Sequence, residues 1–299
     1  MSRVGRKLPR DTRSEARNAD GEAHESDPGD GSPGAEVDSR LQGAPAPRVR
    51  DLFARIASTY DLLNHLLSAG RDRAWRRRLV EALDPGARRI LDLCAGTGDL
   101  ALEIAARGPG ALVCAGDFCY EMLMCGGPKG LQRAAAPAAC DALRLPFADA
   151  TFDAITVAFG VRNFERLDFG LAEMHRVTRP GGQVAVLEFF RSESSWRELP
   201  FRIYFTQVLP RVGRLVSRDP DAYSYLPQSV SRFVTRREFE ALLADTGFTE
   251  IRRREMSLGI ATLSTARVGE RRGRARACGG RSGRRCRRRG RVDSARKGL

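Results

Sequence analysis

Apolar residues recur along this chain at two spacings, and the alternation between the two predicts its architecture. From Val49 to Leu67 they fall three or four positions apart, which predicts a helix over 49–67, and Trp75, Leu79 and Val80 predict a second helix. Short apolar runs that end at glycine or at an acid are typical of buried strands. The pattern predicts strands over 89–94, 112–117, 138–141, 152–159, 183–190, 248–256 and 260–267, and further helices over 100–106, 121–125, 171–177 and 235–244.

Strands that alternate with helices in this way predict an α/β fold. The expected core is a mostly parallel, seven-stranded sheet of Rossmann-like type with helices on both faces. In such a sheet a ligand binds beyond the carboxyl ends of the strands, beside the point where the strand order reverses. Functional residues are therefore expected just after the predicted strands.

The two ends of the chain lack this pattern. Residues 1–48 are rich in Gly, Pro, Ser and charged side chains, so we expect a disordered N-terminal extension, and we expect a disordered Arg-rich tail over 268–299. This leaves 49–267 as the folded domain. From residue 267 onward, thirteen arginines and one lysine face two acids, so most of the net charge of +14 lies in the tail. The charge therefore does not indicate a nucleic-acid-binding face, and no specific nucleic acid partner is expected.

Cysteine usage and hydropathy narrow the class further. The seven cysteines include no Cys-x-x-Cys pair, so neither a zinc site nor a dithiol redox centre is indicated, and no metal is expected. No apolar stretch is long enough to span a bilayer, and the N-terminus lacks the apolar segment of a secretory signal. We therefore expect a cytoplasmic protein.

The turn after the first predicted strand is the first candidate for chemistry, with the sequence Asp-Leu-Cys-Ala-Gly-Thr-Gly over 92–98. Gly96 and Gly98 let the backbone turn sharply and approach a ligand closely. Their spacing with Ala101 also fits the dinucleotide fingerprint, so the turn alone is compatible with an NAD-dependent oxidoreductase. Asp92 favours S-adenosylmethionine instead, because its carboxylate suits a cationic methionine amino group and has no use beside a pyrophosphate.

Two further acids follow predicted strands. Asp117 ends the second strand, where a carboxylate accepts hydrogen bonds from both ribose hydroxyls of an adenosine cofactor. It could also cap the following helix. Asp141 and Ala142 end the third strand, where they can receive the adenine amino group, and Leu143 offers the ring an apolar wall. Together with Asp92, the Asp141 loop favours S-adenosylmethionine over NAD.

Several short segments carry a more specific pattern. They are Ala57–Asn64, Leu91–Leu100, Asp117–Phe118 with Met122–Leu123, Leu145–Phe147, Phe159–Phe164, Arg176–Gly182 and Tyr223–Val230. Through these segments the chain resembles the ubiquinone/menaquinone biosynthesis C-methyltransferase family (UbiE/MenG type) over 49–267. The segments Phe159–Phe164 and Tyr223–Val230 are far more diagnostic than the glycine turn.

The resemblance implies a class I methyltransferase that uses S-adenosylmethionine to methylate a ring carbon of a prenylated quinol. It favours demethylmenaquinol but leaves a benzoquinol substrate and the oligomeric state open, a homodimer included. Two positions depart from the family: Ala158 stands where many members carry serine, and Cys119 replaces a small polar residue that could cap a helix. The cofactor contacts that the resemblance implies are Thr97, Asp117, Asp141 and Ala142.

Catalysis at a quinol ring carbon needs a hydroxyl that is at least partly ionised, and a positive group near the oxygen favours that anion. Arg162, just past the fourth strand, is the candidate, but it could instead pair with Glu165 or Asp168 at the surface. Three further residues are catalytic candidates. Asn163 could orient the second oxygen, whereas Tyr225 and Tyr60 could bond the ring or close the pocket, with Asp61 steering both tyrosines. The alternative for Tyr60 is a packing role on its helix.

The segment over 199–216 mixes apolar side chains with arginines. We expect it to receive the isoprenoid tail and to touch an anionic membrane surface, with an ordinary packing helix as the alternative. The Arg-rich tail also raises two rival functions, a methyltransferase for nucleic acid and a degenerate domain with a binding arm. The lack of aromatic residues interleaved with the tail arginines argues against the first, and the intact pocket residues argue against the second.

Overall fold

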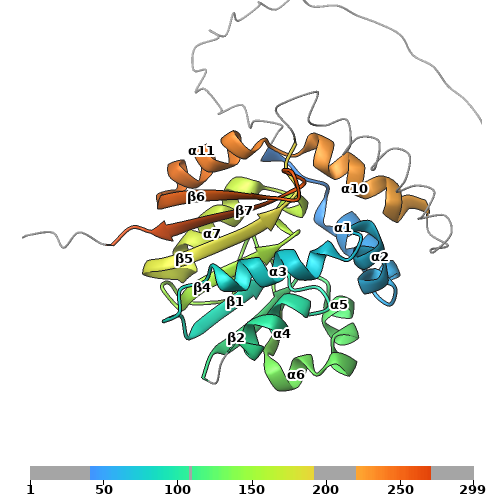
Figure 1. Cartoon of the computed structure of the whole chain (residues 1–299), viewed down its shortest axis with the longest axis horizontal. Coiled ribbons are helices and arrows are strands. Elements are labelled where there is room, and N and C mark those ends of the chain that lie inside the picture. The colour runs from blue at the N-terminus through green and yellow to red at the C-terminus, as the bar shows by residue number, and fades with distance from the viewer. Residues whose placement is uncertain (1–40, 108–109, 192–219, 271–299) are drawn as a thin grey trace, which may run out of the picture. The chain divides into compact units, whose positions relative to one another are not determined.

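Seven strands form one sheet in the computed structural model, which describes residues 41–107, 110–191 and 220–270. The strand order is β3-β2-β1-β4-β5-β7-β6 (Figure 1). Neighbouring strands from β3 to β5 run parallel, whereas β7 runs antiparallel to both β5 and β6. The predicted α/β fold with a mostly parallel, seven-stranded sheet is confirmed. The strands are β1 (Arg89–Leu93), β2 (Leu112–Asp117), β3 (Ala136–Ala139), β4 (Phe152–Ala158), β5 (Thr178–Glu188), β6 (Phe248–Met256) and β7 (Ala261–Val268).

Helices flank this sheet, and the last of them begins at a capping box as the sequence predicts. The Thr235 hydroxyl accepts from the Glu238 N–H, and the Glu238 carboxylate accepts from the Thr235 N–H. The helices are α1 (Ala46–Ile56), α2 (Tyr60–Leu67), α3 (Arg71–Glu81), α4 (Asp99–Ala106), α5 (Tyr120–Cys125), α6 (Leu131–Ala134), α7 (Leu167–Val177), α10 (Pro220–Arg232) and α11 (Arg236–Thr246), with short 3-10 helices η2 (Gly127–Lys129) and η3 (Val161–Asn163).

The sheet separates two apolar clusters. On one face, Leu171 of α7 and Phe239 of α11 pack against the strands, and on the other face Leu79 of α3 and Ile104 of α4 do so. All four side chains are fully buried. The helices therefore cover both faces of the sheet, and its carboxyl edge remains for a site.

Alternation along β1 decides which face each of its residues meets. Ile90 packs in the α3–α4 cluster, whereas Leu91 and Leu93 pack in the α7–α11 cluster. Asp92 shares the face of Ile90, because side chains alternate along a strand. Its carboxylate is buried next to Thr156, its partner in register on β4.

The helix predicted over 49–67 is wrong as a single element, since α1 and α2 are separated by a turn at residues 57–59. The N–H and the hydroxyl of Thr59 both donate to the carbonyl oxygen of Ile56, at 2.9 and 3.2 Å, and this tighter turn interrupts the helical ladder. Tyr60 therefore opens a new helix. α1 itself begins at Ala46, three residues before the predicted start of the domain.

Two predicted strand boundaries also need correction. β3 covers Ala136–Ala139, so Asp141 lies beyond the strand and does not end it. β5 begins at Thr178, and the Pro-Gly-Gly sequence over 180–182 lies inside this strand and does not separate it from the helix. Thr178 pairs with Phe152, and a shift of register before Ala154 accommodates the extra residues of β5.

Candidate active site

A cavity lies beyond the carboxyl ends of β1, β2 and β4, where the α/β topology places a ligand. Residues of α1 and the first residue of α2 complete its walls, and it encloses about 790 Å³ including its open mouth, a size typical of small-molecule sites. Seven residues for which the sequence analysis proposed a contact with cofactor or substrate line it together: Tyr60, Gly96, Asp117, Asp141, Ala142, Leu143 and Asn163.

The glycine turn uses its two glycines for different purposes. Both have positive φ, +58° at Gly96 and +82° at Gly98, a region that disfavours other residues. Gly96 lines the cavity, and a Cβ there would lie 3.4 Å from the terminal methyl of Met122. Gly98 lies away from this lining, and a Cβ there would come within 2.5 Å of Leu131 on α6. Packing against α6 therefore explains Gly98.

Asp92 is a buried acid with one unpartnered oxygen. Its Oδ1 accepts from the Thr156 hydroxyl at 2.9 Å, whereas its Oδ2 has no hydrogen-bond partner among the described residues. Burial raises the pKa of Asp92 to about 7, against the opposing effect of the Thr156 hydroxyl. A buried carboxylate oxygen without a donor is unfavourable, so this position fits a cationic ligand group.

Asp117 and Asp141 both point acceptors at the cavity while bonding the backbone. Asp117 accepts from the N–H of Gly96 at 2.7 Å and from the N–H of Cys119 at 2.8 Å, and burial raises its pKa. Asp141 accepts from the N–H of Leu143 at 2.8 Å. A carboxylate offers about four acceptor positions, so both acids retain capacity for ligand hydroxyl or amino groups. The helix cap that the sequence analysis allowed for Asp117 is wrong, because the Asp117 carboxylate bonds the N–H of Cys119, the residue before α5, and α5 has no side-chain cap.

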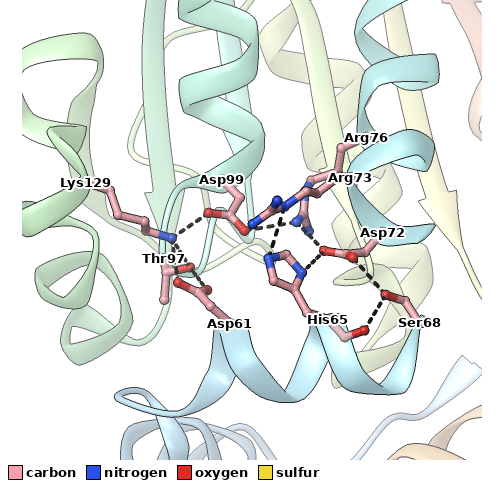
Figure 2. A network of polar contacts seen from close by, with 9 residues as sticks. All are labelled: Asp61, His65, Ser68, Asp72, Arg73, Arg76, Thr97, Asp99 and Lys129. Atoms are coloured by element: carbon pink, nitrogen blue, oxygen red, sulfur yellow. Dashed lines mark hydrogen bonds and ion pairs between the residues drawn. The ribbon is translucent and has the colours of Figure 1, made fainter. Parts of the chain in front are cut away.

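Thr97 is buried and bonds two protein side chains (Figure 2). Its hydroxyl donates to Asp61 Oδ1 at 2.5 Å and accepts from Lys129 Nζ at 2.8 Å. Lys129 also binds Asp61 and Asp99. Burial alone would raise the pKa of Asp61, but the hydrogen bonds from Lys129 and Thr97 outweigh this effect, so the pKa lies below its ordinary value. Asp61 therefore ties α2 to the glycine turn. The sequence analysis expected Asp61 to steer Tyr60 and Tyr225, but the partners that the described residues give its carboxylate are Thr97 and Lys129.

The same network continues through α3 (Figure 2). Arg76 Nη2 binds Asp72 at 2.5 Å and Asp99 at 2.9 Å. Asp72 in turn binds the Nδ1 of His65 at 2.8 Å and accepts from the Ser68 hydroxyl at 2.7 Å. Charged side chains from α2, α3 and α4 thus meet beside the glycine turn, a feature that the sequence analysis missed because its members lie far apart in the chain.

Arg162 is buried in an ion pair with Glu188, the last residue of β5. Nη1 lies 2.7 Å from Glu188 Oε1 and also donates to the carbonyl of Phe159, and the two paired side chains are 7% and 0% exposed. Burial raises the pKa of Glu188, and the guanidinium opposes that rise. The surface pair with Glu165 or Asp168 is therefore wrong. Glu188 escaped sequence analysis, although an acid inside an apolar run was a signal for it.

A hydrogen bond joins two of the catalytic candidates. The Tyr225 hydroxyl donates to Asn163 Oδ1 at 2.8 Å, and Phe53 lies edge-on to both tyrosines, 5.8 Å from Tyr60 and 6.4 Å from Tyr225 between ring centroids. Burial raises the pKa of each tyrosine. Asn163 lines the main cavity, whereas Tyr225 and Arg162 line a neighbouring one. Phe53, which the sequence analysis treated as an ordinary apolar position, is part of the site.

The departures from the resembled family have visible consequences. Ala158 lines the cavity with a methyl group and offers no hydroxyl there. Cys119 precedes α5 and makes no side-chain cap. In the described part of the chain, no cluster of His, Cys, Asp and Glu has the arrangement of a metal site, and no helix is long and apolar enough to cross a membrane. The segment over 199–216 lies outside the described residues.

Comparison with known proteins agrees with this geometry. The model of the ubiE/COQ5 methyltransferase family matches residues 41–267. A demethylmenaquinone methyltransferase of Deinococcus radiodurans is 45% identical over 222 residues, which cover 72% of this chain and 90% of the relative. A ubiquinone/menaquinone biosynthesis C-methyltransferase UbiE of Geobacter sulfurreducens is 42% identical over 231 residues, 74% of this chain and 89% of the relative.

Solved structures show the same fold. A SAM-dependent methyltransferase of Thermotoga maritima superposes with a TM-score of 0.52 at 17% identity, over 73% of this chain and 99% of that chain. Fold and site together define a methyltransferase that takes its methyl group from S-adenosylmethionine. This decides against the oxidoreductase that the glycine turn alone allowed. The chain belongs to the ubiE/COQ5 methyltransferase family.

Proposed function

We propose that this enzyme methylates a ring carbon of a prenylated quinol, and that the quinol is demethylmenaquinol. The observation that carries the proposal is the mixed lining of the cavity. The carboxylates of Asp117 and Asp141 line it together with the aromatic residues Phe53 and Tyr60 and with Asn163. These residue types suit an adenosine and an aromatic ring, and the names of the relatives supply the quinone.

The acidic residues account for the cofactor. Asp141 and Ala142 receive the adenine amino group, Asp117 accepts from the ribose hydroxyls, and the free Oδ2 of Asp92 accepts from the methionine ammonium. The absence of a side chain on Gly96 lets the backbone approach the ligand. When bound, the sulfonium supplies an electrophilic methyl group.

The aromatic residues account for the methyl acceptor. Phe53 and Tyr60 hold the quinol ring so that its carbon faces the methyl group, and positioning of this kind contributes several kcal/mol to the rate. The side-chain N–H of Asn163 donates to a ring oxygen, and the Tyr225 hydroxyl holds Asn163 in place by donating to its Oδ1. With the cofactor bound, these residues would serve the replacement of the ring-carbon hydrogen by the methyl group, and the hydrogen would leave as a proton to solvent.

Arg162 enters this proposal in a changed form. Its guanidinium is already paired with Glu188, so it supplies less net charge to a quinolate than a lone arginine would. We propose that it acts as part of that pair, beside Asn163. Arg162→Lys and Arg162→Ala are expected to lower kcat for quinol methylation, and intact methylation in both variants would exclude this role.

A direct assay decides the substrate. The purified full-length protein is incubated with labelled S-adenosylmethionine and, in parallel, with demethylmenaquinol and a demethylated benzoquinol, and the products are identified by mass spectrometry. We expect one methyl group on the naphthoquinol ring. Tyr225→Phe, which removes only the hydroxyl that binds Asn163, is expected to lower kcat while leaving cofactor affinity unchanged. Methylation of the benzoquinol alone, or of neither quinol, would contradict the proposal.

We also propose that residues 49–267 form the methyltransferase domain and that the segment over 199–216 contacts an anionic membrane surface. The mixture of apolar and basic residues in that segment supports the contact. Liposome flotation with anionic and neutral vesicles tests this contact, and absence of binding to both kinds of vesicle would remove the claim.

We propose in addition that the enzyme forms a homodimer. Sedimentation equilibrium tests this oligomeric state, and a monomer at all concentrations would exclude it.

A further inference from the structure

A second cavity lies beside the main one, and residues of α1, η3 and α10 form its walls together with the segment over 41–45 (Figure 1). It encloses about 960 Å³ including its open mouth. Of the described residues that line it, only Phe164 also lines the main cavity. The hydrogen bond from Tyr225 to Asn163 joins the walls of the two cavities. The second cavity is therefore a separate site that adjoins the main one.

The lining of the second cavity is basic. Three arginines from three different elements contribute to it: Arg48 of α1, Arg162 of η3 and Arg232 at the end of α10. The described lining contains no acidic residue, and its other polar side chains belong to Gln42, Tyr225, Gln228 and Ser229. The charge of Arg162 is balanced by Glu188 at 2.7 Å. Two positive charges in the wall therefore remain uncompensated.

The carboxylates on neighbouring segments are engaged elsewhere. Glu165, just after η3, lines the main cavity and accepts from a backbone N–H at the start of α1. Asp168 of α7 lies 2.7 Å from Arg166 in an ion pair. Arg48 and Arg232 are exposed, and within the described part of the chain neither of them forms an ion pair. Both guanidinium groups are therefore free to bind an anion.

Arg162 adds an unused pair of donors to this wall. Its side chain is only 7% exposed, and its Nη1 donates to Glu188 and to the carbonyl of Phe159. Nε and Nη2 have no acceptor among the described residues, and of these two only Nε is completely buried. A buried N–H without an acceptor is unfavourable, so an oxyanion held at this edge of the guanidinium would supply what is missing.

Charge and geometry together define the chemical class of the ligand. A phosphate monoester carries about −1.5 to −2 charges near pH 7, which matches two uncompensated arginines better than the single charge of a carboxylate does. The fork of an arginine side chain binds two phosphate oxygens at once. The volume of the cavity also leaves room for an organic group beside the phosphate.

We propose that the second cavity binds a phosphate monoester. The Nε–Nη2 edge of Arg162 holds two phosphate oxygens, and the guanidinium groups of Arg48 and Arg232 neutralise the charge. The phosphate belongs either to a soluble monoester or to the headgroup of phosphatidic acid, since both present the same group to the arginines. This site does not depend on the identity of the quinol.

Calorimetric titration of the full-length protein with glycerol 3-phosphate tests the site. About 0.15 M KCl screens weak association of the ligand with the Arg-rich tail. We expect saturable binding that Arg48→Met and Arg232→Met each weaken by about 5- to 30-fold. Glycerate, which carries a carboxylate in place of the phosphate, is expected to bind the wild type at least about tenfold more weakly.

Arg55→Met is the matched control, because Arg55 lies two turns after Arg48 on α1, is exposed and lines neither cavity. It is expected to leave the affinity for glycerol 3-phosphate unchanged. Arg162→Lys keeps the charge beside Glu188 but removes the fork, so it is expected to weaken binding as well. An unchanged thermal midpoint shows that a variant is folded.

Flotation with phosphatidylcholine vesicles, with and without phosphatidic acid, distinguishes the two sources of the phosphate. If the Arg48→Met/Arg232→Met double variant loses the binding that depends on phosphatidic acid, the ligand is the lipid headgroup. If wild type and double variant float equally while the variant loses affinity for glycerol 3-phosphate, the ligand is a soluble monoester.

Three results would overturn the proposal. The first is a wild type that shows no saturable binding of glycerol 3-phosphate. The second is equal affinity in the wild type and the double variant, which would mean that the phosphate binds elsewhere on the chain. The third is binding of glycerate as tight as that of glycerol 3-phosphate, because the cavity would then not recognise phosphate.

Discussion

Asp92 is the buried acid whose replacement gives the sharpest test of the site. Asp92→Asn keeps the shape of the side chain and removes the buried negative charge. The native pKa of about 7 lies above the unfolded value of 3.8, so between these values the unfolded chain is ionised while the native carboxyl is protonated. The wild type therefore loses stability as the pH rises through this interval, by about 4 kcal/mol in total, and levels off above it.

Urea denaturation of both proteins without ligand, from pH 5 to pH 8, measures this difference. The asparagine variant is expected to gain on the wild type progressively with pH and to be the more stable of the two at pH 8. Thr156→Val, which removes the hydroxyl that binds Oδ1, is expected to enlarge the loss in the wild-type background. A constant difference between Asp92→Asn and wild type across the range would refute the reasoning, because no buried charge would then be titrating.

Three further substitutions test packing and pairing, each by urea or thermal denaturation. Gly98→Ala is expected to destabilise by about 3 kcal/mol, because φ is +82° and the new Cβ would clash with Leu131; a loss below 1 kcal/mol would show that the turn relaxes. Glu188→Gln leaves the charge of Arg162 buried without its partner, so a loss of about 3 kcal/mol is expected, and unchanged stability would contradict the pair. Thr235→Ala removes the capping box and is expected to lower the free energy of unfolding by about 1 kcal/mol, and unchanged stability would mean that the cap contributes nothing.

The sequence analysis was most accurate where a signal is local. The spacing of apolar residues predicted the strands other than β5 to within two positions at each end. The central strands β1 and β4 are buried along most of their length, and such burial requires continuous apolar runs. It failed at the break between α1 and α2, where the helical spacing persists through a turn that Thr59 closes with local hydrogen bonds. It also misplaced the start of β5, since a Pro-Gly-Gly sequence ordinarily ends an element and here lies within a strand.

The sequence by itself determined the sheet, the glycine turn and the acids Asp92, Asp117 and Asp141, because each of these depends on neighbours a few residues away. Only the tertiary structure decided the partners. Glu188 meets Arg162 from the next strand of the sheet, and Arg76 reaches the pocket of Asp92 from α3, a helix that packs against α4 and β5. Such contacts depend on how elements distant in the chain pack together, and periodicity carries no information about that.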